Sequence, residues 1–152
     1  MAGAIQPRIN KAILSLLGAD ATLKGLLADL GALVTPADGA PLFWFRAPAS
    51  VEPPYIVFGP QDTQSTIEPT RCGEFGQGQI NYIVELITEG ISPEDGLAAM
   101  DRVGVLLDGY DASVDGQVLN FQAIGDMCYP DFEASEFGVT HTASVYRVLL
   151  RP

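Results

Sequence analysis

The chain is poor in the side chains that most often carry catalysis or bind metals. Of its 152 residues, one is His, two are Cys and eight are Lys or Arg. Zinc sites usually need several His or Cys ligands, so we expect neither a metal nor a cofactor. The segment with Gly73, Gly76 and Gly78 precedes an expected strand, so no helix N-terminus is available there for a phosphate. These shortages predict a protein that works through its surfaces.

The cysteines and the N-terminus give an expectation about the cellular compartment. Cys72 and Cys128 lie far apart, which is typical of free thiols in a reducing environment, although a disulfide between them stays open. The apolar stretch near Met1 is interrupted by Arg8 and Lys11, unlike a signal peptide. No run approaches the roughly 20 apolar residues that span a bilayer. We therefore expect a soluble intracellular product.

Basic residues are outnumbered throughout the chain. The 19 acids against 8 Lys and Arg give a net charge of −11, and the acids form no run. Nucleic-acid-binding proteins gain affinity from Lys and Arg on phosphates, so this chain should repel DNA on average. Hydrophobic residues make up 47% and charged residues only 18%, which predicts one domain with a real core. The low charged fraction also suggests that partners cover part of the surface.

Apolar periodicity predicts one α+β domain over residues 1–152, mainly an antiparallel β-sheet with two or three helices packed on one face and a long hairpin-like loop. Gly18 is expected to end the first helix, and Asp20 to cap the second. The expected helices are Ile5–Leu17, Asp20–Leu30 and Pro93–Leu107. The expected strands are Leu42–Arg46, Tyr55–Phe58, Ile80–Ile87, Val118–Ile124, Met127–Glu133 and Gly138–Leu150.

The residue patterns also predict which side chains are buried. Tyr55–Phe58 is apolar on both sides, so this strand is expected to be buried on both faces. Trp44 and Phe45 are expected in the core with Arg46 at the sheet edge. Stacking of these rings on nucleic acid is disfavoured by the acidic surroundings. The inner face of the third helix is expected to contain Leu97, Met100, Val103, Gly104 and Leu107.

The segment Gln61–Gln79 is long, polar and rich in glycine, and it lies between two expected strands. Loops of this length inside a compact domain are uncommon and are usually functional or disordered. We interpret it as a partner-binding arm, with a plain loop as the alternative. Isolated arginines in an acidic protein often anchor interfaces through carboxylates. The interface candidates are therefore Arg46, Gln64, Ile67, Glu68, Arg71, Phe75, Arg147 and Arg151.

No catalytic residue is assigned. His141, the single imidazole, lies in the middle of an expected strand and is interpreted as a structural residue bonded to a neighbour. Acid pairs such as Glu94 with Asp95 fit helix capping. The stretch Asp108–Asp115 lacks the ligand spacing of an EF-hand. A small acidic hydrolase that uses carboxylates and a ligand-binding module stay open as alternatives; each predicts a deep pocket.

Several short motifs carry a family resemblance. They are Asp20–Leu27, Arg46–Pro48, Pro54–Phe58 and the helix Leu97–Gly109, in this order between an opening helix and a closing strand. In this order of elements the chain resembles the tail terminator and tail-completion proteins of long-tailed bacteriophages. A head-closure or connector protein of the neck and a tail-tube subunit are the alternatives within the same class.

The resemblance implies a structural protein of the virion. It would form a ring, commonly hexameric, that caps the tail tube, stops its polymerisation and joins the tail to the head and neck proteins. Such a protein is assembled in the host cytoplasm and ends in the tail or neck of the virion. Genome DNA would pass through an electronegative lumen without specific binding. The arm Gln61–Gln79 would meet the tube or a neighbouring subunit.

Overall fold

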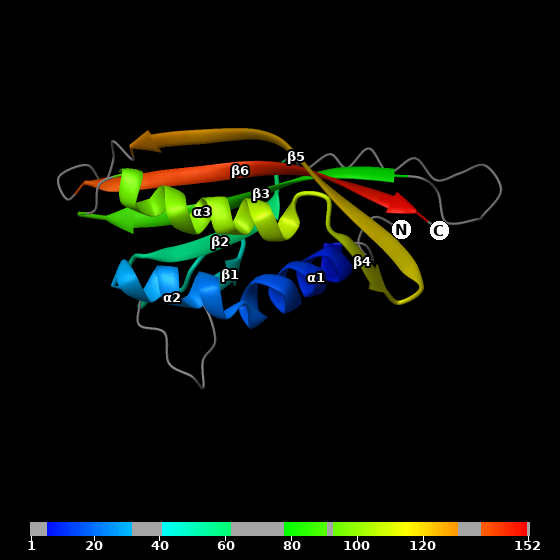
Figure 1. Ribbon diagram of the computed structural model, residues 1–152, viewed down its shortest axis with the longest axis horizontal. Helices are drawn as coiled ribbons and strands as arrows, with labels where there is room; N and C mark the ends of the chain where they lie inside the picture. Colours follow the sequence, from blue (N-terminus) through cyan, green and yellow to red (C-terminus); the bar gives the residue numbers. More distant parts are fainter. Residues whose placement is uncertain (1–5, 32–40, 62–77, 91–92, 131–137, 152) are drawn as a thin grey trace.

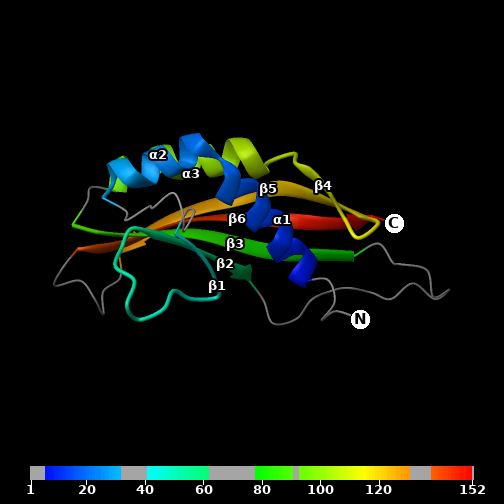
Figure 2. The same ribbon diagram turned by 90° about the horizontal axis from the view of Figure 1, so that it is seen from below.

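The computed structural model describes residues 6–31, 41–61, 78–90, 93–130 and 138–151. These residues form one six-stranded sheet with three helices on one of its faces (Figures 1 and 2). The α+β architecture expected from the sequence is confirmed. The helices are α1 (Gln6–Ala19), α2 (Ala21–Asp29) and α3 (Pro93–Leu107), and the strands are β1 (Leu42–Trp44), β2 (Tyr55–Pro60), β3 (Gly78–Glu89), β4 (Asp111–Val114), β5 (Gln117–Pro130) and β6 (Val139–Arg151).

The last strand in the sequence lies in the middle of the sheet. The strand order is β1-β2-β3-β6-β5-β4, and every neighbouring pair is antiparallel except β1 with β2. β6 pairs along its length with β3 on one side and β5 on the other. The two edge strands, β1 and β4, are short, and β4 pairs with β5 only from Gln117 to Asn120.

Local signals fix the helix ends. The Asp20 carboxylate accepts a hydrogen bond from the Leu23 N–H at 2.8 Å, so it caps α2 as expected. Gly31, with φ +98°, follows this helix in the left-handed conformation that glycine favours. The expected stop of α1 at Gly18 is wrong by one residue, because the helix continues to Ala19, next to the Asp20 cap.

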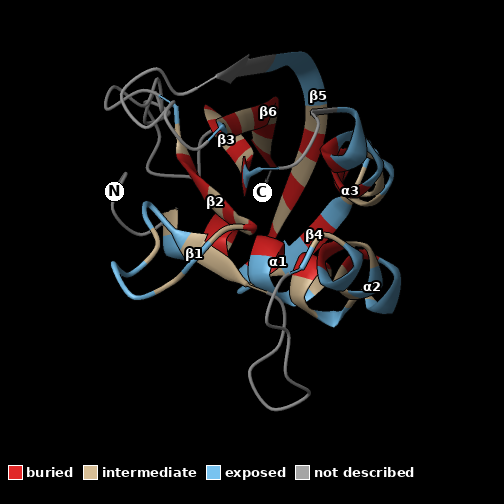
Figure 3. Ribbon diagram, turned by 90° about the vertical axis from the view of Figure 1, so that its left-hand side faces the viewer, coloured by how far each residue is buried: buried red, intermediate tan, exposed pale blue. Residues whose placement is uncertain are grey.

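The core lies between the sheet and the helices (Figure 3). Tyr82 of β3 and Tyr146 of β6 pair across the strands and are fully buried. The Tyr82 hydroxyl donates to Asn10 Oδ1 of α1 at 3.1 Å, which satisfies two buried polar groups at once. Burial raises the pKa of Tyr82, and it raises the pKa of Tyr146 to about 12. Both phenols are therefore neutral packing residues at physiological pH.

Two expectations about the strands are corrected. β2 is not buried on both faces: Ile56 and Phe58 face the core, whereas Tyr55 and Val57 are half-buried on the other side. The segments Val118–Ile124 and Met127–Glu133, expected as separate strands, form the single strand β5 as far as Pro130. A bulge between Ala123 and Gly125 shifts its register and masks the alternation in the sequence.

The strand β4 was not expected from the sequence. Asp115 and Gly116, with φ of 50° and 81°, form the tight turn that joins β4 to β5. Two consecutive positive φ values match the right-handed twist of a hairpin. The stretch Asp108–Asp115 is thus the end of α3 followed by a hairpin strand.

One residue of the expected inner face of α3 points elsewhere. Leu97 is 44% exposed, whereas Met100, Val103 and Leu107 are buried. Near the start of α3 the helix approaches the sheet through Gly96, where an added Cβ would lie 3.3 Å from the Leu86 side chain. This close approach rotates Leu97 away from the core, which spacing alone does not reveal.

Candidate protein-interaction surfaces

Strand β1 ends in a strained turn. The Arg46 N–H donates to the Trp44 carbonyl at 2.8 Å, and Phe45 between them has φ +69°. This is the rarer, positive-φ form of the γ-turn. A non-glycine residue held in such a conformation costs about 1–3 kcal/mol, and strain of this kind concentrates at functional sites. Phe45 still donates its N–H to the Phe58 carbonyl at 3.0 Å, so the turn is anchored to β2.

This turn places two aromatic side chains on the surface. Trp44 is 50% and Phe45 61% exposed, and their rings meet edge to face with centroids 5.2 Å apart. The expectation that they pack in the core is wrong, because β1 stops at Trp44 and the left-handed Phe45 breaks the strand alternation. Arg46 is exposed beside them, as expected for an edge residue. We call Trp44, Phe45 and Arg46 the aromatic turn.

The face of the sheet turned away from the helices, here the open face, carries polar side chains at its centre. Arg147 of β6 lies opposite Asn81 of β3 on one side and Gln122 of β5 on the other. Arg147 Nε and Asn81 Oδ1 are buried, and neither has a hydrogen-bond partner among the described residues. A buried polar group without a partner costs about 1–3 kcal/mol. Arg147 therefore stays an interface candidate, now with a place at the centre of a sheet face.

His141 and Glu85 contact each other further along the same two strands, on the open face. His141 Nδ1 contacts Glu85 Oε1 across β6 and β3, and both side chains are largely buried. The interpretation of His141 as a strand residue bonded to a neighbour is confirmed. Burial, with a smaller contribution from the Glu85 charge, raises the pKa of Tyr55 on the adjacent strand. Tyr55 also meets Phe43 edge to face, with ring centroids 6.1 Å apart.

The other candidates do not gather at one place. Arg151 ends β6, opposite Val118, and its side chain lies outside the described residues. Gln64, Ile67, Glu68, Arg71 and Phe75 also lie outside them, as do Cys72 and the side chain of Cys128. The strands on either side of the expected arm are antiparallel neighbours, and the Gln61 N–H donates to the Asn81 carbonyl at 2.8 Å. The segment therefore joins two adjacent strands, as a hairpin loop does.

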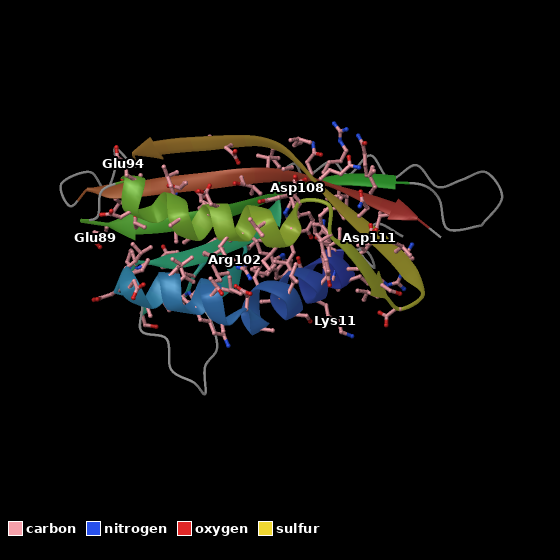
Figure 4. The ribbon with its side chains drawn as sticks, viewed as in Figure 1. Lys11, Glu89, Glu94, Arg102, Asp108 and Asp111 are labelled. Carbon is pink, nitrogen blue, oxygen red and sulfur yellow. The ribbon has the colours of Figure 1, made fainter. Side chains whose placement is uncertain are left out.

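A structural ion pair was missed from the sequence. Arg102 of α3 points towards α2 (Figure 4), where its Nε and Nη2 donate to the two Asp20 carboxylate oxygens at 2.9 and 2.7 Å. Hydrogen bonding to Arg102 lowers the pKa of Asp20. Arg8 of α1 similarly donates to Gln117 Oε1 at 2.5 Å and lies 3.7 Å from Asp115. In the part of the chain that the structure describes, Arg46 and Arg147 have no acidic partner within 4.0 Å.

Several carboxylates of the described residues serve as hydrogen-bond acceptors within the fold. No group of three His, Cys, Asp or Glu side chains in this part of the chain could hold a metal. Asp108 accepts the Ala123 N–H at 2.9 Å and ties the end of α3 to β5, and Asp111 accepts from Asn120 Nδ2 at 2.7 Å and links β4 to β5. A pocket of about 230 Å³ between α1 and β4 has Lys11 and Asp115 as its charged residues. Within the described ranges, no helix is long and apolar enough to cross a membrane.

The fold is similar to that of a protein in a solved virus-like particle. A chain of a structure described as the virion of a native gene transfer agent (GTA) particle matches with a TM-score of 0.69 and 18% sequence identity. The match covers 92% of this chain and 92% of that chain. No family model matches the sequence, and no curated protein matches it. At this identity, the likeness shows a shared fold over nearly the whole length of both chains.

Proposed function

We propose that the chain is a structural protein of a phage-like virion, and that it forms the ring that ends the tail tube and joins the tail to the neck. The observation that carries this proposal is the fold, shared over 92% of both chains with a component of a gene transfer agent virion. The order of the motifs resembles that of tail terminators, and this resemblance favours tail completion among the roles of virion proteins. Its partners are other copies of the chain, the tube protein and the neck proteins.

The surfaces support a role in assembly. The aromatic turn exposes Trp44, Phe45 and Arg46, and Arg46 has no acidic partner among the described residues. Tryptophan and arginine are enriched at the energetic centres of interfaces. The open face adds Arg147, a second arginine without an acidic partner among the described residues. The net charge of −11 suits a ring through which DNA slides without sticking.

The first test is the native mass of the purified protein by sedimentation across a wide range of concentrations. A terminator stops at one discrete ring-sized species, whereas a tube subunit grows into long polymers. Adding the protein to polymerising tail tubes separates the terminator from a neck connector, because only the terminator fixes the tube length. Tubes of unchanged length and no binding to tube ends would contradict the proposed role.

The arm Gln61–Gln79 has its own test within this proposal. Deleting residues 63–76 should leave the sheet intact, because Tyr55–Pro60 pairs with β3 through residues outside the deletion. We expect the deleted protein to stay folded and to lose binding to the tube or to its neighbour. Normal ring formation and tail completion by this variant would contradict the role of the arm.

A further inference from the structure

The aromatic turn is too exposed and too strained to be explained by folding alone. Trp44 and Phe45 leave half or more of their surface in solvent, although burial of aromatic rings is a main source of core stability. The strained Phe45 backbone holds both rings at the edge of the sheet. Aromatic and arginine side chains that are already held rigid lose little entropy on docking, so they suit the centre of a protein interface.

A second exposed apolar surface runs along the outside of α3. Leu97 is 44% and Val105 71% exposed, and Asp101 lies between them at the i+4 position of the same helix face. Ile124 is 43% exposed. It follows Ala123 of β5, whose N–H donates to Asp108 at the end of this helix. We call Leu97, Asp101, Val105 and Ile124 the α3 patch.

The charges around the α3 patch are acidic. Asp101 is exposed in its middle, and Glu94 and Asp108 are exposed near the two ends of the helix (Figure 4). The one arginine of α3, Arg102, turns to the other side and is bound by Asp20. The patch therefore offers apolar side chains among negative charges. This is complementary to two rings beside Arg46, which has no acidic partner among the described residues.

The two surfaces cannot meet within one molecule. β1 and α3 lie on opposite sides of the molecule in the views of Figures 2 and 3. Two different, complementary surfaces on opposite sides of one chain produce a head-to-tail contact, which closes into a ring when the rotation between copies allows it. A symmetric dimer would instead bring one surface onto itself.

We propose that the aromatic turn of one copy docks onto the α3 patch of a second copy of this chain. Trp44 and Phe45 cover Leu97 and Val105, and the Arg46 guanidinium pairs with the Asp101 carboxylate. The contact gives the ring of the proposed function its subunit interface, and in that respect it rests on that proposal. Its own prediction concerns self-association and needs no tail tube.

Trp44 is the only tryptophan of the chain, so its fluorescence reports directly on this contact. In the wild type, raising the protein concentration should shift the emission to the blue and protect it from a soluble quencher. Val105→Glu, which changes the opposite side of the monomer, should abolish both effects. Sedimentation should show that Arg46→Glu and Asp101→Arg each weaken self-association roughly 30-fold, as expected for interface hot spots. The double variant should recover most of the affinity.

Lys11→Glu is the matched control, because Lys11 is exposed on α1 (Figure 4), belongs to neither surface, and its change in charge equals that of Arg46→Glu. It should self-associate like the wild type. A monomer at every concentration, or assembly that Arg46→Glu and Val105→Glu leave unchanged, would overturn the proposal. Assembly that depends on both surfaces but never binds tube ends would keep this interface and reject the tail role. Variants that remain monomeric but still bind tube ends would reject this interface and keep the tail role.

Discussion

The two faces of the sheet differ in whether their buried polar groups have hydrogen-bond partners among the described residues. On the helix side the largest side chains are apolar or neutral, and the buried Tyr82 hydroxyl is bound by Asn10. On the open face, Glu85 pairs with His141, while the buried Arg147 Nε has no hydrogen-bond partner among the described residues. A face that the chain seals itself can satisfy its polar groups internally. A face with an unmatched donor is better suited to a partner that supplies an acceptor.

The largest expected effect lies on the helix side. Phe121→Ala removes a fully buried ring of β5 and should lower the free energy of unfolding by about 3–5 kcal/mol in denaturant titrations. Ile83→Ala on the open face is the matched comparison. Because Ile83 is only half-buried, we expect a loss of about 1–2 kcal/mol. Equal losses at both positions would contradict the difference between the two faces.

The second effect is at the junction of α2 and α3. Asp20→Ala removes the cap of α2 together with both hydrogen bonds from Arg102, and should cost about 1–3 kcal/mol of unfolding free energy. Arg102→Ala leaves the cap in place and should cost less. An equal or larger loss in Arg102→Ala would show that the cap contributes nothing.

The same carboxylate predicts a dependence of stability on pH. Hydrogen bonding to Arg102 lowers the pKa of Asp20 in the folded state. The carboxylate therefore contributes its stabilisation above the ordinary Asp pKa of about 3.9, and this contribution is lost as the pH falls through the folded value. The free energies of unfolding of the wild type and of Asp20→Asn should converge in strongly acidic solution. A constant difference between the two free energies of unfolding from pH 7 to pH 2 would exclude this linkage.

A smaller effect is expected at the centre of the open face. Arg147→Met replaces a buried donor that lacks a partner with an apolar chain of similar length. We expect the free energy of unfolding to change by less than about 1 kcal/mol, or to rise. If Arg147 also contacts a partner protein, the same variant will bind the tube or a second copy more weakly. A large loss of stability would instead show that Arg147 is a structural residue.

The smallest effect on stability is expected at the aromatic turn. Phe45→Gly removes an exposed ring and allows the φ of +69° without strain, so the unfolding free energy should stay within about 1 kcal/mol of the wild type. Self-association should nevertheless fall sharply. A strongly destabilised variant would mean that Phe45 is held in place for folding.

The sequence predicted the parts of the fold that depend on neighbours in the chain. The Asp20 cap, the strand His141 and the class of the fold follow from local spacing and capping chemistry, and the structure confirms them. Periodicity failed where a single backbone feature changes the pattern. The bulge between Ala123 and Gly125 lies within one strand, where the sequence pattern predicted two. Gly96, not Leu97, lies against the sheet.

The sequence by itself therefore determined most of the helices and strands, and an acidic composition with one His and two Cys. The tertiary structure alone decided that β6 inserts between β3 and β5, that Arg102 reaches Asp20 on another helix, and that Trp44 and Phe45 remain at the surface. The physical reason is range: caps and turns are set by groups a few residues apart, whereas burial and pairing depend on segments that meet only after folding. The surfaces proposed to hold copies together belong to this second kind.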